Sequence, residues 1–498
     1  MTSVFTRRDI LASLLATSAS AACANAPETS PFPTPRPANA AALTALGSER
    51  LIAAAELGAS SKVGFVLADA HSGEVLEAKN PILPLPPASV TKSLTALYAL
   101  SHLGTNYRFR TQVFAEGNIS NGRLDGNLWL VGGGDPTLDT NHLASLAQSL
   151  REVGINEVTG EFRVQAQALP YIRQIDSSQP NHLGYNPAIS GLNLNFNRVH
   201  FEWKRAGVGY ATTMEARTNH YRPEVRNARM EIVSRNLPVY TYSERQGQDH
   251  WTVSRQALGD AGSRWLPVRH PESYAAEVFH TMARAQGITL SAPRMVTSAP
   301  QGQIIAEHSS EELPLILRDM LKYSNNLIAE TTGLTATIAG GERPSSLRSS
   351  AQQMDSWCDN TLNTRRARLA DHSGLSEASR LSASDMVRIL TEAGPNGPLR
   401  PLLKGIQLKE ANGGSTGSHR IDIRAKTGTL NFVSSLAGYI RTPSGRDLAF
   451  ATFTADLPRR AAIMRADREA PAGARGWSRR SRAMQLKLIE RWSAVYGS

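Results

Sequence analysis

A serine and a lysine stand three residues apart where a proline-rich run gives way to a helical pattern. The stretch PPASVTKSLTALYAL begins at Pro86 and contains Ser89 and Lys92. Residues i and i+3 share a helix face, so the two side chains are expected within hydrogen-bond reach. A desolvated lysine can take the serine proton, which would make Ser89 a nucleophile. Ser89 could instead only cap the helix, since about one S-x-x-K is expected by chance.

A second motif, Lys426-Thr427-Gly428-Thr429, stands just before the last predicted strand pair. K-T-G occurs by chance in about one chain in twenty of this composition, so it is the more specific signal. On an edge strand beside a cleft, Lys426 would attract a substrate carboxylate and Thr427 would donate a hydrogen bond. Gly428 would let a substrate approach the backbone. The alternative is an ordinary turn at the entry to a strand.

A third motif, YSNNLIAE, starts at Tyr323 after a predicted helix over 313–322. Its S-x-N element, Ser324 and Asn326, is expected about twice by chance, and it could be only a helix C-cap followed by a loop. The order of the motifs gives it weight. S-x-x-K, then S-x-N, then K-T-G is the set of elements found in penicillin-recognising serine enzymes.

With these motifs the chain resembles low-molecular-mass D-alanyl-D-alanine carboxypeptidases and endopeptidases that carry a large insertion, the penicillin-binding protein 4 type. Three further stretches carry the resemblance: GGDPTL from Gly133, NLIAE from Asn326 and DHSGLS from Asp371. The long separation of Ser89 from Ser324 also fits, because simple β-lactamases place these elements much closer together. The resemblance covers essentially the whole mature chain.

The resemblance implies a serine peptidase that acts on peptidoglycan stem peptides and is inhibited covalently by β-lactams. Ser89 would attack the carbonyl of the D-Ala-D-Ala bond with Lys92 as general base, and water would hydrolyse the acyl-enzyme. Ser324 and Asn326 would relay protons and hold the substrate amide. Backbone N–H groups of Ser89 and Thr429 would form the oxyanion hole. The substrate carboxylate and strand would be bound by Lys426, Thr427, Gly428 and Thr429.

The resemblance also singles out Asp135, because the GDPT loop of the inserted domain reaches the active site in this family and helps bind the diaminopimelate side chain. The alternative is a turn-forming aspartate before Pro136. Two positions depart from the family stretch D-G-S-G-L-S-R: His372 replaces a glycine, and Glu377 stands where the arginine is expected. Arg380 could take the place of that arginine, and selectivity among stem peptides is left open.

Two other functions are left open. Tyr323-Ser324-Asn325 also matches the Y-x-N element of class C β-lactamases and esterases, in which Tyr323 would carry protons and Asn325 would bind the substrate. The other is a non-catalytic envelope module that keeps the fold without turnover. The long insertion and the NLIAE continuation favour the peptidase.

The elements around the motifs indicate an α+β multidomain protein. Strand pairs are predicted at 62–78 and 432–454 and helices at 41–57 and 482–496, so both ends of the chain are expected to share one sheet. Between them strands and turns dominate, with helices over 141–153 and 273–287. Since surface loops tolerate insertions, the region is expected to be inserted.

The predicted organisation therefore has a β-lactamase/transpeptidase-like serine domain, an antiparallel sheet flanked by helices. It is formed by residues 41–107 and 301–498, and residues 108–300 form the inserted β-rich region, expected as two nested units. Residues 1–26 have the basic head, apolar stretch and small residues of an export signal. The twin arginines at 7 and 8 leave both twin-arginine and Sec export open.

Residues 27–40 are proline-rich and are interpreted as a tether. The expected location is the periplasm, with membrane contact limited to peripheral association or a lipid anchor at Cys23, which stands in a weak lipobox. Cys358 is the only other cysteine, so no internal disulfide is expected in the mature chain.

The composition fits a globular protein of two or three domains, with 498 residues of which 41% are hydrophobic. Much of the net charge of +11 comes from the arginine-rich segment between Arg459 and Arg482. It lacks the interleaved aromatic residues typical of nucleic-acid binding, so no nucleic-acid partner is expected. No HExxH motif is present, and neither a metal nor another cofactor is expected.

Overall fold

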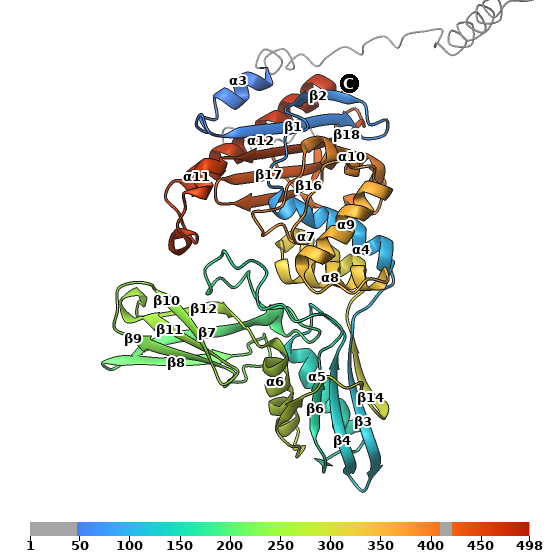
Figure 1. Ribbon diagram of the computed structural model, residues 1–498, viewed down its shortest axis with the longest axis vertical. Helices are drawn as coiled ribbons and strands as arrows, with labels where there is room; N and C mark the ends of the chain where they lie inside the picture. The colour runs from blue at the N-terminus through green and yellow to red at the C-terminus, as the bar shows by residue number, and fades with distance from the viewer. Residues whose placement is uncertain (1–46, 409–420, 498) are drawn as a thin grey trace, which may run out of the picture.

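The computed structural model describes residues 47–408 and 421–497 (Figure 1). The predicted export signal, the tether, Cys23 and the first part of the helix expected at 41–57 lie outside the described residues. No helix among the described residues is both long and apolar enough to cross a membrane.

The serine domain is built on a six-stranded antiparallel sheet in the order β15-β16-β17-β18-β1-β2. β1 pairs with β18 from Lys62 opposite Ala455 to Asp69 opposite Leu448, so the two ends of the chain share one sheet as predicted. The strands are β1 (Lys62–Asp69), β2 (Val75–Lys79), β15 (Lys404–Gly405), β16 (Asp422–Leu430), β17 (Val433–Arg441) and β18 (Asp447–Ala455).

Helices cover both faces of this sheet, because side chains along a strand alternate between its faces. Phe65 and Leu67 of β1 pack with Trp477 and Trp492 of α12 on one face. Val66 of β1 belongs to the core on the other face. The helices are α3 (Ser48–Ala53) and α12 (Ala474–Tyr496) on the first face, and α4 (Thr91–Leu103), α7 (Leu313–Tyr323), α8 (Asn326–Ala339), α9 (Leu347–Thr361) and α10 (Ala383–Ala393) on the second.

Short helical segments lie between the longer elements of the chain. They are η1 (Ala88–Val90), η2 (Asn195–Asn197), η3 (Arg255–Ala257), η4 (Arg400–Leu402), α11 (Leu457–Ala461) and η5 (Arg465–Asp467). Among them, η2 and η3 belong to the inserted region. The segment η1 leads directly into α4 and carries Ser89.

The inserted region extends from one end of the serine domain (Figure 1). Its main sheet has the order β13-β6-β4-β3-β14, with β5 beside β4, and two three-stranded sheets have the orders β12-β7-β8 and β10-β11-β9. The strands of the main sheet are β3 (Arg110–Ser120), β4 (Arg123–Gly132), β5 (Glu157–Val158), β6 (Phe162–Gln165), β13 (Pro293–Met295) and β14 (Gln303–Ser309). Helices α5 (Thr140–Glu152) and α6 (Pro271–Ala285) pack with this sheet.

The two smaller sheets lie between the strands of the main sheet in the sequence. They contain β7 (Arg198–Ala206), β8 (Gly209–Glu215), β9 (Ala228–Val233), β10 (Tyr240–Arg245), β11 (Gln248–Ser254) and β12 (Ala261–Pro267). This nesting supports a division of the inserted region into two units. We propose that the region continues to Ser309, beyond the expected limit at 300, because β14 pairs with β3.

The fold class expected from the sequence is confirmed. An antiparallel sheet flanked by helices is interrupted by a large β-rich region, as the positions of the strand pairs and turns predicted.

Candidate active site

Ser89 lies in a tight turn, and two glycines allow neighbouring segments to pack closely against it. The preceding Ala88 has a φ of 47°, a left-handed conformation that non-glycine residues seldom adopt. A Cβ added to Gly374 would overlap with the Ala88 carbonyl oxygen, and one added to Gly428 would lie 2.7 Å from the Pro87 oxygen. Ser89 caps neither η1 nor α4 with its side chain. Its half-buried hydroxyl is therefore available to the cavity described below.

Lys92 lies one helical turn after Ser89 and is completely buried. Its Nζ donates hydrogen bonds to Ser89 Oγ at 3.1 Å, to Asn326 Oδ1 at 2.7 Å and to the Ser373 carbonyl oxygen at 2.7 Å. Burial lowers the pKa of Lys92 to about 8, against the opposing effect of the Glu330 and Asp371 carboxylates. The amine therefore lies beside the serine hydroxyl, and its lowered pKa allows it to exchange a proton near neutral pH.

The S-x-N element lies at the junction of α7 and α8. Ser324 ends α7 with a φ of 58°, and Asn325 caps α8 by accepting a hydrogen bond from Ile328 N at 3.1 Å. This break places Ser324 and Asn326 in one cavity wall. Asn326 also donates to the Tyr185 carbonyl oxygen of the inserted region at 2.9 Å. The structure thus brings both predicted residues to Ser89.

The K-T-G element lies on β16. Its neighbour β15 pairs only with Arg424 and Ala425, so no strand in the described part of the chain pairs with the outer edge of Lys426–Thr429. Lys426 Nζ donates to Ser324 Oγ at 3.0 Å. Burial and the nearby positive charge of Lys92 hold the pKa of Lys426 well below its usual value.

Gly428 serves a contact beyond the one expected. The sequence suggested that it would let a substrate approach the backbone. That role stays a prediction, and the structure adds a second one, because a Cβ at this position would meet the nucleophile turn itself, 3.0 Å from Ser89 N. The glycine lets β16 lie directly against η1, which brings Thr429 and Ser89 together.

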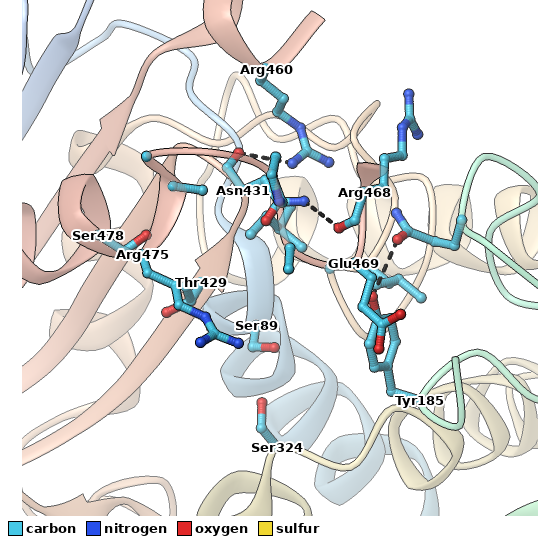
Figure 2. Close-up of a pocket in the computed structure, with 18 of the residues that line it drawn as sticks. Ser89, Tyr185, Ser324, Thr429, Asn431, Arg460, Arg468, Glu469, Arg475 and Ser478 are labelled. Carbon is cyan, nitrogen blue, oxygen red and sulfur yellow. Dashed lines mark hydrogen bonds between the residues drawn. The ribbon is translucent and has the colours of Figure 1, made fainter. Parts of the chain in front are cut away.

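A cavity of about 750 Å³ opens beside these residues and is lined by Ser89, Ser324, Asn326 and Thr429 (Figure 2). The side chains of Ser89 and Ser324 point toward one another, and Arg460 and Arg468 lie across the cavity from them. A neighbouring cavity of about 800 Å³ is lined by Ser324 and by Lys404, Lys426, Thr427 and Arg482. The two cavities share Ser324.

The segment after α11 contacts the inserted region at the edge of the cavity. Arg465 donates to the Gln179 carbonyl oxygen at 2.9 Å. Glu469, which lines the cavity, lies 2.8 Å from His182 Nε2 and 2.7 Å from a guanidinium nitrogen of Arg264. Hydrogen bonds from His182 and Arg264 lower the pKa of Glu469 to about 2. The cavity wall therefore includes residues of both regions.

Asp135 is the one predicted site residue that the structure does not bring to Ser89. It is 2% exposed and lines neither of these two cavities. One carboxylate oxygen accepts a hydrogen bond from Thr137 N at 2.8 Å, and the other lies 3.5 Å from His308 Nε2. Its role in substrate binding stays a prediction.

The geometry does not favour the Y-x-N interpretation. Tyr323 is 67% exposed and lines a third cavity, of about 650 Å³, but not the cavity that contains Ser89. Asn325 is engaged in capping α8. Ser324 and Asn326 are the members of this stretch that line the wall near Ser89.

His372, which replaces the expected glycine, is accommodated by a second glycine. The imidazole is completely buried, stacks on Tyr98 and has Nε2 2.8 Å from Ser350 Oγ. Burial lowers the pKa of His372 to about 3, so the ring is neutral. A Cβ added to Gly333 in α8 would overlap with this ring. The departure at 372 is therefore matched by a small residue on the facing helix.

Glu377, which replaces the expected arginine, faces two arginines from the arginine-rich segment. Its carboxylate lies 3.6 Å from Arg460 and 3.8 Å from Arg468. Arg380 donates instead to the Ser379 carbonyl oxygen at 2.9 Å and does not line the cavity. The sequence showed these arginines only as a concentration of charge. Nothing in the spacing of the segment indicated which of them would reach the cavity.

We expect Gly333→Ala to destabilise the protein by about 1–3 kcal/mol through overpacking against His372, although alanine normally favours a helix. In a His372→Ala background, the same change should be neutral or stabilising. Urea unfolding of the four proteins in this double-mutant cycle measures the coupling. Equal effects of Gly333→Ala in both backgrounds would contradict the proposed compensation.

Comparisons with known proteins agree with this geometry. Residues 49–470 match the D-Ala-D-Ala carboxypeptidase 3 (S13) family. The chain is 25% identical over 425 residues to D-alanyl-D-alanine carboxypeptidase DacB of Haemophilus influenzae. The alignment covers 79% of this chain and 85% of that protein. The chain is also 26% identical over 423 residues to the D-alanyl-D-alanine carboxypeptidase of Actinomadura sp. strain R39, covering 78% of this chain and 76% of that protein.

The fold is also similar to a solved structure. The crystal structure of penicillin binding protein 4 from Haemophilus influenzae matches with a TM-score of 0.68 at 22% identity, covering 82% of this chain and 93% of that one. The resemblance inferred from the three motifs and their order is thus confirmed. With the match spanning most of its length, the chain belongs to the D-Ala-D-Ala carboxypeptidase 3 (S13) family of serine peptidases.

Proposed function

We propose that this D-Ala-D-Ala carboxypeptidase hydrolyses peptidoglycan stem peptides through an acyl-enzyme on Ser89. The observation that carries the proposal is the buried Lys92 amine, which donates to both Ser89 Oγ and Asn326 Oδ1. A serine beside a lysine of lowered pKa is the arrangement that general-base activation of a hydroxyl requires. Cleavage of terminal and of cross-linking peptide bonds uses the same acylation step, so the proposal includes both.

In the proposed reaction, Ser89 Oγ attacks the carbonyl carbon while its proton passes to neutral Lys92. The developing oxyanion accepts hydrogen bonds from Ser89 N and Thr429 N, a kind of contact worth about 10²–10³ in rate per donor. Collapse of the tetrahedral intermediate breaks the peptide bond, and the proton on Lys92 passes by way of Ser324 to the leaving amine, which returns Lys92 to its neutral form. Water then attacks the ester, gives a proton to the base and releases the acid and Ser89.

The leaving group would be bound in the cavity that contains Lys426 and Thr427. Its walls also carry Lys322, Lys404 and Arg482 against one acid, Asp422, and this excess of basic side chains suits the carboxylate of the departing D-alanine. Asn326 and the unpaired edge of β16 would hold the substrate backbone by strand addition.

The acyl part of the substrate would lie beyond Thr429, where three arginines line the Ser89 cavity. Arg460 is 7% exposed and donates to the Asn431 carbonyl oxygen at 2.9 Å. Arg468 donates to the Ser178 carbonyl oxygen at 3.2 Å. Arg475 is exposed at the start of α12 and makes no such contact in the described part of the chain. Because Glu469 also lines this wall and Glu377 faces Arg460 and Arg468, Arg475 is the residue that supports selection of stem peptides with a carboxylate on the acyl side.

We also propose a periplasmic location. It rests on the export-signal pattern of residues 1–26 and on the proposed peptidoglycan substrate. A lipid anchor at Cys23 belongs to the same proposal, and the mass of the mature N-terminus would reveal it.

Acylation by benzylpenicillin should rise about tenfold per pH unit up to about pH 8 and then level off. The reason is that only neutral Lys92 can accept the serine proton, and burial places the pKa of Lys92 at about 8. Stopped-flow measurement of the acylation rate constant across this range tests the expectation. A flat profile between about pH 6 and pH 9 would exclude Lys92 as the titrating base.

A fluorescent penicillin should label the wild type but not Ser89→Ala, because only the Ser89 ester would hold the label. Ser324→Ala should lower acylation by about 10²-fold or more, and Tyr323→Phe, the matched control, should leave it unchanged. Purified uncross-linked and cross-linked muropeptides, digested side by side, would show which bonds are cut. Labelling without release of D-alanine or of cross-linked products would contradict a peptidase.

Arg475→Gln should reduce acylation by carbenicillin about threefold to tenfold relative to benzylpenicillin. The two penicillins differ by one carboxylate on the acyl side chain, which the Arg475 guanidinium could bind. Arg479→Gln, one turn further along α12 and exposed, is the matched control. An unchanged ratio of the two rate constants in Arg475→Gln would argue against an anionic acyl-side site.

A further inference from the structure

Two buried carboxylates hold the segment Asp371–Ser376 in place. Asp371 accepts hydrogen bonds from Gly374 N at 2.7 Å and Ser376 N at 2.6 Å. Glu330, on the second turn of α8, accepts from His372 N at 3.0 Å and Ser373 N at 2.9 Å. Both acids are at most 1% exposed. Four backbone N–H groups of one short segment are thus satisfied by two carboxylates.

Because the N–H groups of this segment face the carboxylates, two of its carbonyl groups are directed toward α4. The His372 carbonyl oxygen accepts from Thr95 Oγ1 at 2.6 Å, and the Ser373 carbonyl oxygen accepts from Lys92 Nζ at 2.7 Å. Thr95 and Lys92 are both completely buried. Glu330 therefore contacts the residue that holds the Lys92 amine.

We propose that Glu330 is a positioning residue for the reaction: it fixes Ser373, whose carbonyl holds the Lys92 amine beside Ser89, and its ionised form places a buried negative charge near that amine. The inference rests on the proposed role of Lys92 as base. Glu330 touches neither Ser89 nor the cavity, so it acts through Lys92.

The ionisable groups around Lys92 come from three elements. Glu330 of α8 and Asp371 of the held segment both raise its pKa, in opposition to burial. Lys426 of β16 interacts with Lys92 as a like charge. Burial keeps His372 neutral. Burial and the Asp371 carboxylate in turn raise the pKa of Glu330 to about 8, the same range as that of Lys92. The ionised form of Glu330 raises the pKa of Lys92, so we expect the pKa of Lys92 to fall when this form is removed.

Glu330→Gln keeps the size of the side chain but loses its charge and turns an amide donor toward one backbone N–H. We expect the plateau rate constant of benzylpenicillin acylation, reached above the midpoint, to fall about tenfold or more, because the Lys92 amine is less well held. The midpoint of the pH profile should also move to lower pH, by about one unit. A residue that only stabilised the fold would lower the rate without moving the midpoint.

Asp355→Asn is the matched control. Asp355 of α9 is also a buried acid, and it accepts a hydrogen bond from Leu369 N at 2.8 Å, but Lys92 is not among its neighbours. It should lose stability and keep the wild-type midpoint. A midpoint that is unchanged in Glu330→Gln, or that shifts equally in Asp355→Asn, would overturn the proposal.

If Glu330→Gln fails to fold, Glu330→Asp decides. It keeps the charge but withdraws it by one methylene, so we expect slower acylation with the wild-type midpoint, and an unchanged rate would overturn the proposal. Absence of any labelling of the wild type would instead count against the proposed function. The two failures are therefore distinguishable.

Discussion

The burial of one amine is the constraint on which the active site depends. Moving an ammonium group out of water costs several kcal/mol unless its donors are satisfied, and the three acceptors of Lys92 come from three segments far apart in the sequence. The turn at Ser89, the start of α8 and the segment after α9 must all meet at one point. A change that separates any of them leaves a buried donor without an acceptor.

Close approach of backbones is what makes this convergence possible. At Gly374 and Gly428, two segments pack against the turn before Ser89 so closely that a Cβ at either position would overlap with its backbone. Gly333 makes room for His372 in the same core. The nucleophile turn is thereby fixed by steric contact from several directions, which holds Ala88 in its unusual backbone conformation.

The sequence predicted much of the serine-domain sheet because the signals of its strands are local. β1 falls on the predicted 62–69 run, and the alternation and turns at the other end of the chain identified β17 and β18. The start of α12 was not predicted, since the helix begins at Ala474 and not near residue 482. The many arginines in its first turns obscure the apolar periodicity to which Trp477 belongs. The pairing of β14 with β3 was missed as well, since no short-range pattern specifies a strand partner so distant in sequence.

For the site residues, too, local patterns could be predicted and contacts between distant segments could not. The residues of the three motifs could be named because each motif is short, but their approach within hydrogen-bond distance depends on tertiary packing. Glu330 was visible only as one letter of the NLIAE stretch, and its contact with the 371–376 segment could not be read from spacing. The same holds for Arg460, whose position in the cavity wall follows from the short helix α11 after β18.

The pairing of β1 with β18 also has a consequence for how the chain is made. On the ribosome, β1 emerges before the whole inserted region, and β18, which pairs with it along its full length, emerges after that region. The inserted region has its own core and is complete before that point. Ser89 and Lys92 are therefore synthesised long before the sheet beside them can close, and the nascent serine domain is completed only after β16, β17, β18 and α12 have emerged.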